Sequence, residues 1–478
     1  MLTLKEIQKQ LESRIFHIVG ETADDMGYEC YVVGGYVRDL FLERHSKDKD
    51  FVTVGSGIEL AKAVAKRIGK GAHCSYFQNF GTAQVKYRAD ELEFVGARKE
   101  SYRRDSRNPI VENGTLDDDL SRRDFTINAM AISLNAANYG ELVDRFGGLD
   151  DLAAGVIRTP LDPDITFSDD PLRMFRAIRF ATQLNFEIAP NTFEAIRRNA
   201  ERIKILTRER IATELSKIMC SPMPSIGWKL LRDAGLLKIF LPELEAMAGV
   251  EVVNGRGHKD NFYHTMEVLD KVAAADTNCN EWLRWGALLH DIAKPQTKRY
   301  DEKAGWTFHN HNFVGAKMLP RIFRNLKLPL DERLKYVQKL VELHMRPIAL
   351  VEEVTDSAIR RLIFEAGDDI DDLMILCRAD ITSKNPEKVR RHLENFEMVL
   401  EKMRIINEKD NLRNWQPPID GNEIMAIFGI GQCRAVGEIK NYEKDQLLES
   451  ETPNDRELAL KLVLEKGASL GLTPTLRP

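Results

Sequence analysis

Residues 30–55, CYVVGGYVRDLFLERHSKDKDFVTVG, decide how the N-terminal part of the chain folds. The apolar run 30–33 is typical of a buried strand, and Gly34 and Gly35 end it directly before a helical segment. A second apolar run, 51–54, follows the charged stretch KDKD. Strands that alternate with a helix predict a unit of the α+β or α/β class.

The same pattern extends in both directions from this stretch. Residues 2–27 predict one amphipathic helix, and glycine-broken apolar runs predict further strands up to about residue 144. A loop is expected over 155–171, and helical periodicity continues from there to the C-terminus. The chain is therefore expected to be an α+β protein, with a mixed sheet and helices first and a helical remainder. Breaks in the pattern near residues 155, 230–250 and 390–415 predict the domain boundaries.

The composition is that of an ordinary globular protein. The 478 residues include 69 Lys and Arg against 74 Asp and Glu, a formal net charge of −5, and 43% are hydrophobic. This balance excludes a general nucleic-acid coat but leaves room for a local basic groove. The first twenty residues carry charges where a signal peptide needs an apolar core, and no apolar run approaches the length of a membrane span. A cytoplasmic protein without a membrane partner is expected.

Two carboxylates follow the glycine turn. In a strand, Asp48 and Asp50 would project from the same face, because side chains alternate along a strand. Adjacent carboxylates repel unless a cation lies between them, and Glu93 on a neighbouring strand would complete a two-metal cluster for phosphoryl transfer. The alternative is that Asp48 and Asp50 are exposed charges at a strand edge, as Lys49 between them suggests.

A second group of charged residues could recognise a nucleobase. The motif RRDFTINAMAI spans residues 122–132, and a helix is expected to begin around residues 168–173, with Asp170 as its cap. A carboxylate beside a guanidinium, as in Asp170 and Arg173, offers an acceptor next to donors. Such a pair could select the amino-bearing edges of cytosine and adenine. Local capping and pairing are the alternative, which the residues alone favour.

Six histidines fall between residues 258 and 344. His290 and Asp291 directly follow the apolar stretch WLRWGALL, so they are expected at the end of a buried helix. Imidazole and carboxylate groups together suit a divalent transition metal, or magnesium where carboxylates dominate. The stretch RKESYRRDSRNP at 98–109, by contrast, predicts a basic loop without regular structure.

The motifs resemble those of a known family. GGYVRDLF, Asp48-x-Asp50, RRDFTINAMAI, LVDRFGGLDDL and DDPLRMFRAIRFATQLNF occur in the order and spacing of the class II tRNA nucleotidyltransferase/poly(A) polymerase family, over residues ~30 to ~245. The resemblance implies a polymerase-β-like nucleotidyltransferase head at 1–155 and a helical neck at 156–245, which recognises the base and binds RNA. An HD body domain at 246–395 and a helical, tRNA-binding tail at 396–478 would follow.

The resemblance also implies roles for individual residues. Asp48 and Asp50 would bind Mg²⁺ as catalytic residues, with Glu93 as a supporting carboxylate. The implied nucleotide-binding residues are Gly34, Gly35, Arg38, Arg122, Arg123, Asp124, Asn128, Asp170, Arg173 and Arg176. Two positions depart from the family pattern. Asp169 replaces a usual glutamate, and Lys49 replaces a usual apolar residue, so that its side chain needs a partner or a path to solvent.

The histidine-rich segment resembles the HD phosphohydrolase superfamily. His264, His290, Asp291 and Asp380 match its metal ligands in order, and His311 and His344 fall where members with two metals have additional ligands. The metal would be a divalent ion. An HD fold that is retained only as a tRNA-binding body is the alternative.

Together the two resemblances imply an enzyme that adds CMP and AMP from CTP and ATP to the 3′ end of tRNA. Its partners would be tRNA, ATP and CTP, and its head would use Mg²⁺. A poly(A) polymerase, or an enzyme that adds only CC or only A, is the alternative within the family. An HD phosphohydrolase whose head only binds RNA is the alternative from another class.

Overall fold

The computed structural model describes residues 2–46, 48–78, 81–101, 110–350, 355–383, 385–410, 412 and 415–475. It consists of two compact units, residues 1–242 and 243–478. The four-domain division expected from the sequence remains a prediction. Among the described residues, no helix is long and apolar enough to cross a membrane.

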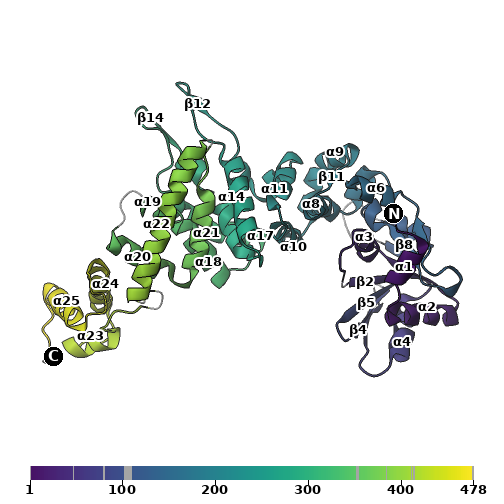
Figure 1. The fold of residues 1–478 in the computed structure, drawn as a ribbon, viewed down its shortest axis with the longest axis horizontal. Helices are drawn as coiled ribbons and strands as arrows, with labels where there is room; N and C mark the ends of the chain where they lie inside the picture. Colours follow the sequence, from purple (N-terminus) through teal and green to yellow (C-terminus); the bar gives the residue numbers. More distant parts are fainter. Residues whose placement is uncertain are drawn as a thin grey trace. The chain divides into compact units, whose positions relative to one another are not determined.

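The first unit is built on a mixed sheet (Figure 1). Seven strands follow the order β3-β4-β5-β2-β1-β8-β9. The strands of this unit are β1 (Glu29–Val33), β2 (Asp48–Val54), β3 (His73–Phe77), β4 (Thr82–Tyr87), β5 (Asp90–Gly96), β6 (Arg98–Ser101), β7 (Ile110–Asn113), β8 (Met130–Ser133), β9 (Leu142–Asp144), β10 (Val156–Ile157) and β11 (Glu187–Ile188). The α+β class expected from the sequence is confirmed.

Helices surround the sheet, and the later part of this unit is mainly helical. They are α1 (Leu4–Gln10), α2 (Arg14–Met26), α3 (Gly35–Phe41), α4 (Gly57–Ile68), α5 (Leu116–Ser121), α6 (Gly148–Ala154), α7 (Pro163–Asp169), α8 (Leu172–Leu184), α9 (Pro190–Asn199), α10 (Arg208–Met219), α11 (Pro224–Asp233) and α12 (Leu237–Phe240), with α13 (Pro242–Glu245) at the junction. Helices α8 and α10 pack together, and Ile178 on α8 and Leu215 on α10 are both fully buried.

The strand-to-helix turn forms as its sequence predicts. Strand β1 is buried beyond its first residue, and β2 pairs with it antiparallel. Gly34 has φ +70°, a conformation that side chains other than glycine rarely adopt, and helix α3 begins at the next residue. Strand β2 pairs with β5 in parallel, with Asp50 opposite Glu93. The turn and the register bring the glycines and the acids to the same place.

Three local predictions were wrong. The single helix expected over residues 2–27 is two helices, because α1 ends at residue 10 and α2 starts only at Arg14. The loop expected over residues 155–171 contains α7, which Asp162 caps by accepting a hydrogen bond from the N–H of Asp164, with Pro163 at the first position. The first residues of the expected basic loop form β6, and residues 102–109 lie outside the described residues.

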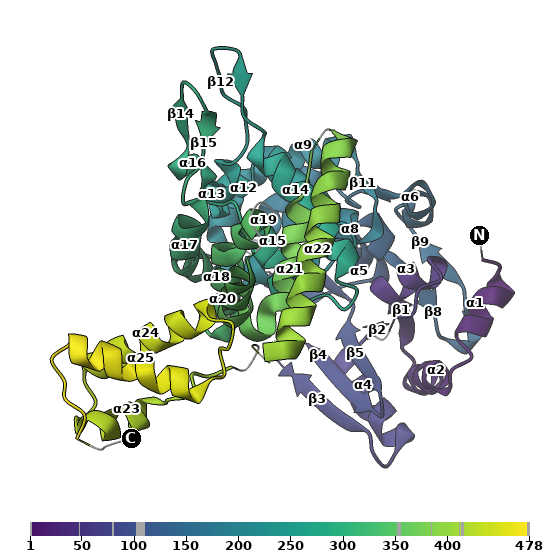
Figure 2. The same cartoon turned by 60° about the vertical axis from the view of Figure 1, so that its left-hand side comes forward.

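The second unit is mainly helical (Figure 2). Its helices are α14 (Asn261–Ala275), α15 (Glu281–Leu289), α16 (Lys294–Thr297), α17 (His311–Leu326), α18 (Glu332–Leu343), α19 (Met345–Leu350), α20 (Asp356–Ala366), α21 (Ile370–Asp380), α22 (Pro386–Asp410), α23 (Gly421–Phe428), α24 (Arg434–Glu449) and α25 (Arg456–Ser469). Two short hairpins, β12 (Val252–Val253) with β13 (Arg256–Gly257) and β14 (Arg299–Asp301) with β15 (Gly305–Thr307), lie side by side (Figures 1 and 2).

Helix α24, which packs against α23 and α25, carries a fully buried acid, Glu443. Its Oε1 accepts a hydrogen bond from the N–H of Ile419, whereas its Oε2 is buried without a partner among the described residues. Burial raises the pKa of Glu443 to about 7. The folded chain therefore binds this proton more tightly than the unfolded chain does.

Stability of these helices is expected to fall as the pH rises through the pKa of Glu443. The contribution is fully present below about pH 4.5 and is lost toward pH 7, because ionisation then places an unpaired charge in the core. Urea unfolding between pH 5 and 8 measures the slope. Glu443→Gln should flatten it, and Glu438→Gln on the exposed side of the same helix should not. An unchanged slope in Glu443→Gln would contradict the assignment.

Candidate active and metal sites

Three carboxylates meet on one face of the sheet in the first unit. Asp50 lies opposite Glu93 on the parallel neighbour strand, and Asp48 lies two residues before it on the same face. Burial raises the pKa of Asp50 to about 6, with further contributions from the charges of Glu93 and Asp48. Arg123 opposes this shift only in part. The cluster thus has excess negative charge, and its oxygen ligands suit a hard cation such as Mg²⁺.

The glycine turn faces this cluster closely. A Cβ added at Gly34 would lie 3.1 Å from Nη1 of Arg123 and 3.8 Å from Oδ2 of Asp50. One added at Gly35 would lie 3.6 Å from Nη2 of Arg38. The backbone of this turn therefore lies against the guanidinium groups of Arg123 and Arg38 and against one acid of the cluster.

A chain of hydrogen bonds leads from this turn to helix α8. Nη1 of Arg38 donates to Oδ1 of Asn128 at 2.9 Å, and Nδ2 of Asn128 donates to Oδ1 of Asp124 at 3.1 Å. Nε of Arg176 then donates to Oδ2 of Asp124 at 2.7 Å. Burial would raise the pKa of Asp124, but the guanidinium of Arg176 overcomes this and lowers it to about 2. Asp124 is thus an ionised anchor between sheet and helix.

Phe180 joins the same group from α8. Its ring lies 5.0 Å from the guanidinium carbon of Arg38 and 5.5 Å from that of Arg176. The guanidinium carbon of Arg179 lies 4.0 Å away, and Nε of Arg179 donates to Glu214 at 2.6 Å. Sequence reasoning missed Phe180, because a phenylalanine on a helix indicates core packing by default.

Sequence reasoning also missed Asp119, which is fully buried. Arg122 donates to its Oδ1 and Arg123 to its Oδ2, so one carboxylate orients both arginines. The two guanidinium groups outweigh the effect of burial and keep the pKa of Asp119 below its usual value. Arg122 and Arg123 follow Asp119 by three and four residues at the end of α5, and this spacing is the signal that could have found it.

Asp170 and Arg173 lie at the N-terminal turn of α8. Oδ1 of Asp170 accepts from the N–H of Leu172 at 3.1 Å, so it caps the helix, although that helix begins one residue later than expected. Nη2 of Arg173 donates to the carbonyl oxygen of Arg122 at 2.7 Å. Burial raises the pKa of Asp169, which Arg173 partly offsets. The structure thus places Asp169 and Arg173 close together, beside the arginines that Asp119 orients.

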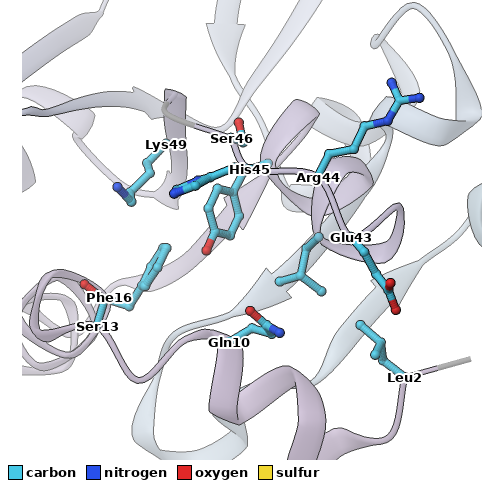
Figure 3. Close-up of a pocket in the computed structure, with 11 residues that line it drawn as sticks. Leu2, Gln10, Ser13, Phe16, Glu43, Arg44, His45, Ser46 and Lys49 are labelled. Atoms are coloured by element: carbon cyan, nitrogen blue, oxygen red, sulfur yellow. The ribbon is translucent and has the colours of Figure 1, made fainter. Parts of the chain in front are cut away.

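Lys49 projects from the opposite face of β2, as side-chain alternation requires. Its Nζ bonds Oδ1 of Asp90, the partner that the sequence required without identifying. A cavity of about 600 Å³ lies on this side, and Lys49, Phe16 and His45 are among its lining residues (Figure 3). The lysine therefore lies apart from the acid cluster.

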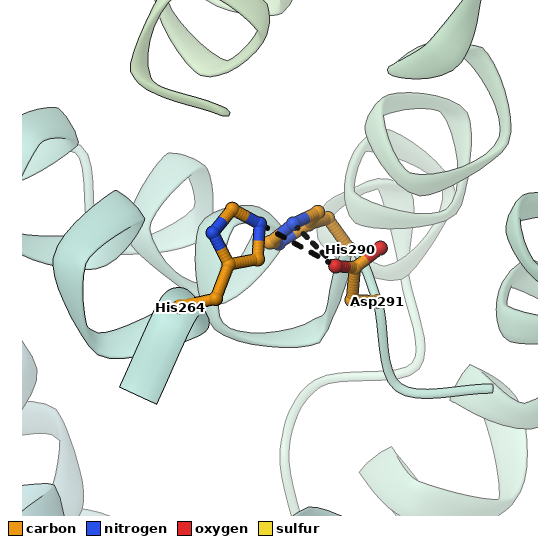
Figure 4. Close-up of side chains that lie close together, drawn as sticks. All are labelled: His264, His290 and Asp291. Carbon is orange, nitrogen blue, oxygen red and sulfur yellow. Dashed lines mark ion pairs between the residues drawn. The ribbon is translucent and has the colours of Figure 1, made fainter. Parts of the chain in front are cut away.

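A second cluster lies in the second unit, where the ends of α15 and α21 meet α14. His264, His290 and Asp291 form a buried group (Figure 4). Oδ2 of Asp291 lies 3.2 Å from Nε2 of His290 and 3.6 Å from Nε2 of His264. Oδ1 of Asp380 lies 2.8 Å from Nε2 of His264 and 3.6 Å from Nε2 of His290. Four predicted ligands therefore converge.

Asp291 also faces two further histidines with its other oxygen. Oδ1 lies 3.1 Å from Nε2 of His311 and 3.8 Å from Nε2 of His344. The two ring nitrogens are themselves 3.3 Å apart. One carboxylate thus belongs to two adjacent groups of potential ligands, and the structure brings His311 and His344 to the positions that the sequence suggested.

Backbone contacts orient three of these rings. Nδ1 of His290, His311 and His344 lies 2.7–2.8 Å from the carbonyl oxygen three residues earlier in each case. Donation from Nδ1–H to a carbonyl leaves Nε2 as the free ligand atom, which is the usual support of a metal-binding imidazole. Nε2 of His290 is buried without hydrogen-bond geometry to any described residue. The donor set fits a divalent metal ion.

Charge coupling in the cluster is strong. Although burial alone would lower it, the carboxylates of Asp291 and Asp380 raise the pKa of His290 to about 10. Burial and the neighbouring His290 lower the pKa of His344 to about 4. Without a metal ion, a proton on His290 thus balances the two carboxylates. A divalent cation would take over that role.

The fold and the two clusters define a nucleotidyltransferase that carries an HD domain. Family models of the poly(A) polymerase head domain, of the probable RNA- and SrmB-binding site of polymerase A, and of the HD domain match residues 30–158, 185–247 and 261–385. The A-adding tRNA nucleotidyltransferase of Deinococcus radiodurans is 32% identical over 416 residues, which cover 85% of this chain and 89% of that one. The chain belongs to the tRNA nucleotidyltransferase/poly(A) polymerase family.

Other relatives agree on the family. The multifunctional CCA protein of Neisseria meningitidis is 32% identical over 326 residues, which cover 66% of this chain and 72% of that one. A crystal structure of a tRNA nucleotidyltransferase complexed with a primer tRNA and an incoming ATP analogue is 28% identical, with a TM-score of 0.56. The match covers 80% of this chain and 99% of that one. The relatives thus include enzymes named for adding A and for adding CCA.

Proposed function

We propose that this enzyme adds CMP and AMP, from CTP and ATP, to the 3′ end of tRNA. The observation that carries the proposal is that the acid cluster around Asp50 lies beside the glycine turn, and that hydrogen bonds lead from Arg38 on that turn through Asp124 to α8. Acids for the chemistry, arginines for a triphosphate and a polar pair for a base occur in that order. The relatives that bind a primer tRNA and an ATP analogue support this substrate class.

Asp48 and Asp50 would hold Mg²⁺, with Glu93 as a supporting carboxylate. A metal ion held by these residues would lower the pKa of the terminal ribose hydroxyl and neutralise charge on the departing pyrophosphate. The hydroxyl would attack the α-phosphorus in line and lose its proton to water, so that a new P–O bond forms as the bond to the departing pyrophosphate breaks. Arg123, Arg38 and the amides at Gly34 and Gly35 would hold the triphosphate. Positioning and electrostatics then supply most of the rate.

Asp170 and Arg173 would select the base without a template. Cytosine and adenine each present an amino donor beside a ring-nitrogen acceptor, which match a carboxylate and a guanidinium. Guanine and uracil reverse this pattern at the corresponding edge. They would place an acceptor against the carboxylate and a donor against the guanidinium. The bonds to Leu172 N–H and to the carbonyl of Arg122 fix the pair at the turn of α8.

Incorporation of labelled CTP and ATP, alone and together, into tRNA that lacks CCA tests the proposal. We expect two C residues and then one A. Addition of A alone would instead place the chain with the A-adding enzymes, a second candidate that the Deinococcus relative favours. A long A tail without CTP would identify a poly(A) polymerase. Absence of any incorporation would contradict the proposal.

Asp119 provides a more specific test of the arginine pair. Asp119→Asn should raise KM for the nucleotide about tenfold, because a neutral amide holds Arg122 and Arg123 less firmly. Asp117→Asn is the matched control, since Asp117 lies exposed on the same helix and pairs with Arg145. Steady-state incorporation kinetics measure both variants. Equal KM values in the two would show that Asp119 does not position the arginines.

We further propose that the HD cluster is a metal-dependent phosphohydrolase. The observation that favours it is that Asp291 faces one group of histidines with one carboxylate oxygen and a second group with the other. His264, His290, Asp291 and Asp380 would hold one divalent ion, and Asp291, His311 and His344 a second. Two ions held this close can polarise a phosphoester and activate water. Phosphate release from phosphoesters, measured with Mn²⁺ and after chelation, tests this activity.

A further inference from the structure

The two hairpins of the second unit carry an aromatic group close to the HD cluster. The ring of His258 lies 5.3 Å from that of Trp306 and 6.0 Å from that of Phe308, nearly perpendicular to both. Nε1 of Trp306 donates to the carbonyl oxygen of Arg256 at 3.0 Å, so the tryptophan joins one hairpin to the other. All three rings are only partly buried. We call these three residues the aromatic ledge.

Lysines connect the ledge to the metal ligands. Nζ of Lys294 lies 5.7 Å from the centre of the Phe308 ring and donates to Oδ2 of Asp291 at 2.6 Å. The carbonyl oxygen of Phe308 is also the one that lies 2.8 Å from Nδ1 of His311. Phe308 is therefore adjacent to the cluster, and Trp306 lies one ring further out.

A small cavity adjoins the ledge. Its volume is about 230 Å³, and its lining includes His258, Asn261, Pro295 and Lys298. Nζ of Lys298 lies 5.3 Å from the centre of the Trp306 ring. Nζ of a third lysine, Lys259, lies 2.9 Å from Nδ1 of His264. Ammonium groups thus flank the metal ligands, and planar rings with a recess lie beside them.

This arrangement fits a ligand with one anionic end and one flat aromatic end. A phosphate at the cluster would lie near Lys294 and Lys259, which each contact one of the potential metal ligands. A planar group attached to it would then reach the rings, where stacking is favourable for any base because every base has a π-face. Inorganic phosphate or a sugar phosphate alone would leave the ledge unused.

We propose that the HD site binds the phosphoester of a nucleoside and that the aromatic ledge, chiefly Trp306, holds its base. This inference rests on the proposed phosphohydrolase for its chemistry but concerns recognition. The nucleoside phosphate can come from a free mononucleotide or from the 3′-phosphorylated end of an RNA, which share the same chemistry. Trp306 is a specificity residue in this proposal and takes no part in bond breaking.

Binding to the full chain loaded with Mn²⁺ tests the proposal. Isothermal titration compares AMP, a short RNA with a 3′-phosphate, ribose 5-phosphate and inorganic phosphate. Asp291→Ala identifies the heat that belongs to the HD site, because the head also binds nucleotides. We expect Trp306→Ala to weaken AMP or RNA binding about tenfold or more, since base stacking is worth roughly 1–3 kcal/mol per base. Binding of the two base-free phosphates should not change.

Three comparisons keep the test decisive. Trp306→Phe retains a stacking ring and should bind AMP and RNA like the parent chain. Trp282→Ala alters a tryptophan of α15 that lies outside the ledge, and it should also bind them like the parent chain. Circular dichroism and metal content show whether the Trp306→Ala variant is folded. Unchanged AMP and RNA binding in Trp306→Ala, or equal losses for all four ligands, would overturn the proposal.

The readouts also separate this proposal from the phosphohydrolase. If AMP or RNA binds in a Trp306-dependent manner but no phosphoester is cleaved, the proposal that the aromatic ledge holds a base is supported and the proposed phosphohydrolase activity is wrong. If phosphoesters that carry a base and phosphoesters that lack one are cleaved with the same kcat/KM, the proposed phosphohydrolase activity is supported and the proposed role of the aromatic ledge is wrong. Tighter binding of the RNA than of AMP would identify an RNA end as the source of the nucleoside phosphate.

Discussion

Replacement of Asp50 by alanine is expected to reduce nucleotide incorporation into tRNA by about 10³-fold, since removal of one preorganised charge from a transition state costs about that much. Asp50 is the most enclosed acid of its cluster, and burial together with Glu93 raises its pKa to about 6. Its carboxylate is therefore the one for which a bound Mg²⁺ gains most. The measurement is single-turnover incorporation of ATP and CTP with Mg²⁺ in excess.

A second acid variant controls for general loss of charge. Glu59→Gln alters an exposed residue of α4 and should leave incorporation within about twofold of the parent chain. Thermal unfolding should be unchanged or slightly improved in Asp50→Ala, because the variant removes the repulsion of the half-buried Asp50 by Glu93 and Asp48. Incorporation at more than a tenth of the parent rate would mean that Asp50 does not bind the catalytic metal.

Asp291→Ala is expected to abolish metal binding in the HD domain and with it any phosphohydrolase activity, about 10³-fold or more. The carboxylate faces His264 and His290 with one oxygen and His311 and His344 with the other, so its loss removes a ligand from both groups at once. Metal content per chain after loading with Mn²⁺ and dialysis, measured by mass spectrometry, should fall by the two ions of the HD cluster.

The matched control lies on α14. Glu267→Gln alters a carboxylate that pairs with Lys271 near the same cluster, and metal content should be unchanged. Nucleotide incorporation by the head should stay within about twofold in both variants, because its acids are in the other unit. Retention of both metal ions by Asp291→Ala would show that the carboxylate does not bridge the two groups.

Local signals determined the elements that hold both sites. The apolar runs predicted β1, β2, β4 and β5, and alternation within β2 placed Asp48 and Asp50 on one face and Lys49 on the other. These conclusions depend on neighbours along the chain, which is why a single sequence sufficed. Where a nearby capping residue competed with the overall pattern, as at Asp162, the sequence reading missed a helix.

The motifs that resemble known families indicated candidate site residues that the local signals did not indicate. On residues alone, Asp170 and Arg173 were better explained as a local cap, and capping is indeed part of what Asp170 does. The order of five motifs along the chain indicated a site instead. The matching family models agree with that reading of the family, while the roles of the individual residues await the experiments above.

Only the tertiary structure decided which groups meet across long stretches of chain. Asp90 as the partner of Lys49, and Asp291 as a carboxylate shared by two sets of histidines, each depend on strand register or helix packing. The same holds for the ledge, where Trp306 joins two hairpins that are separated by about forty residues. Sequence patterns report periodicity within an element, whereas distances between elements arise only when the chain packs.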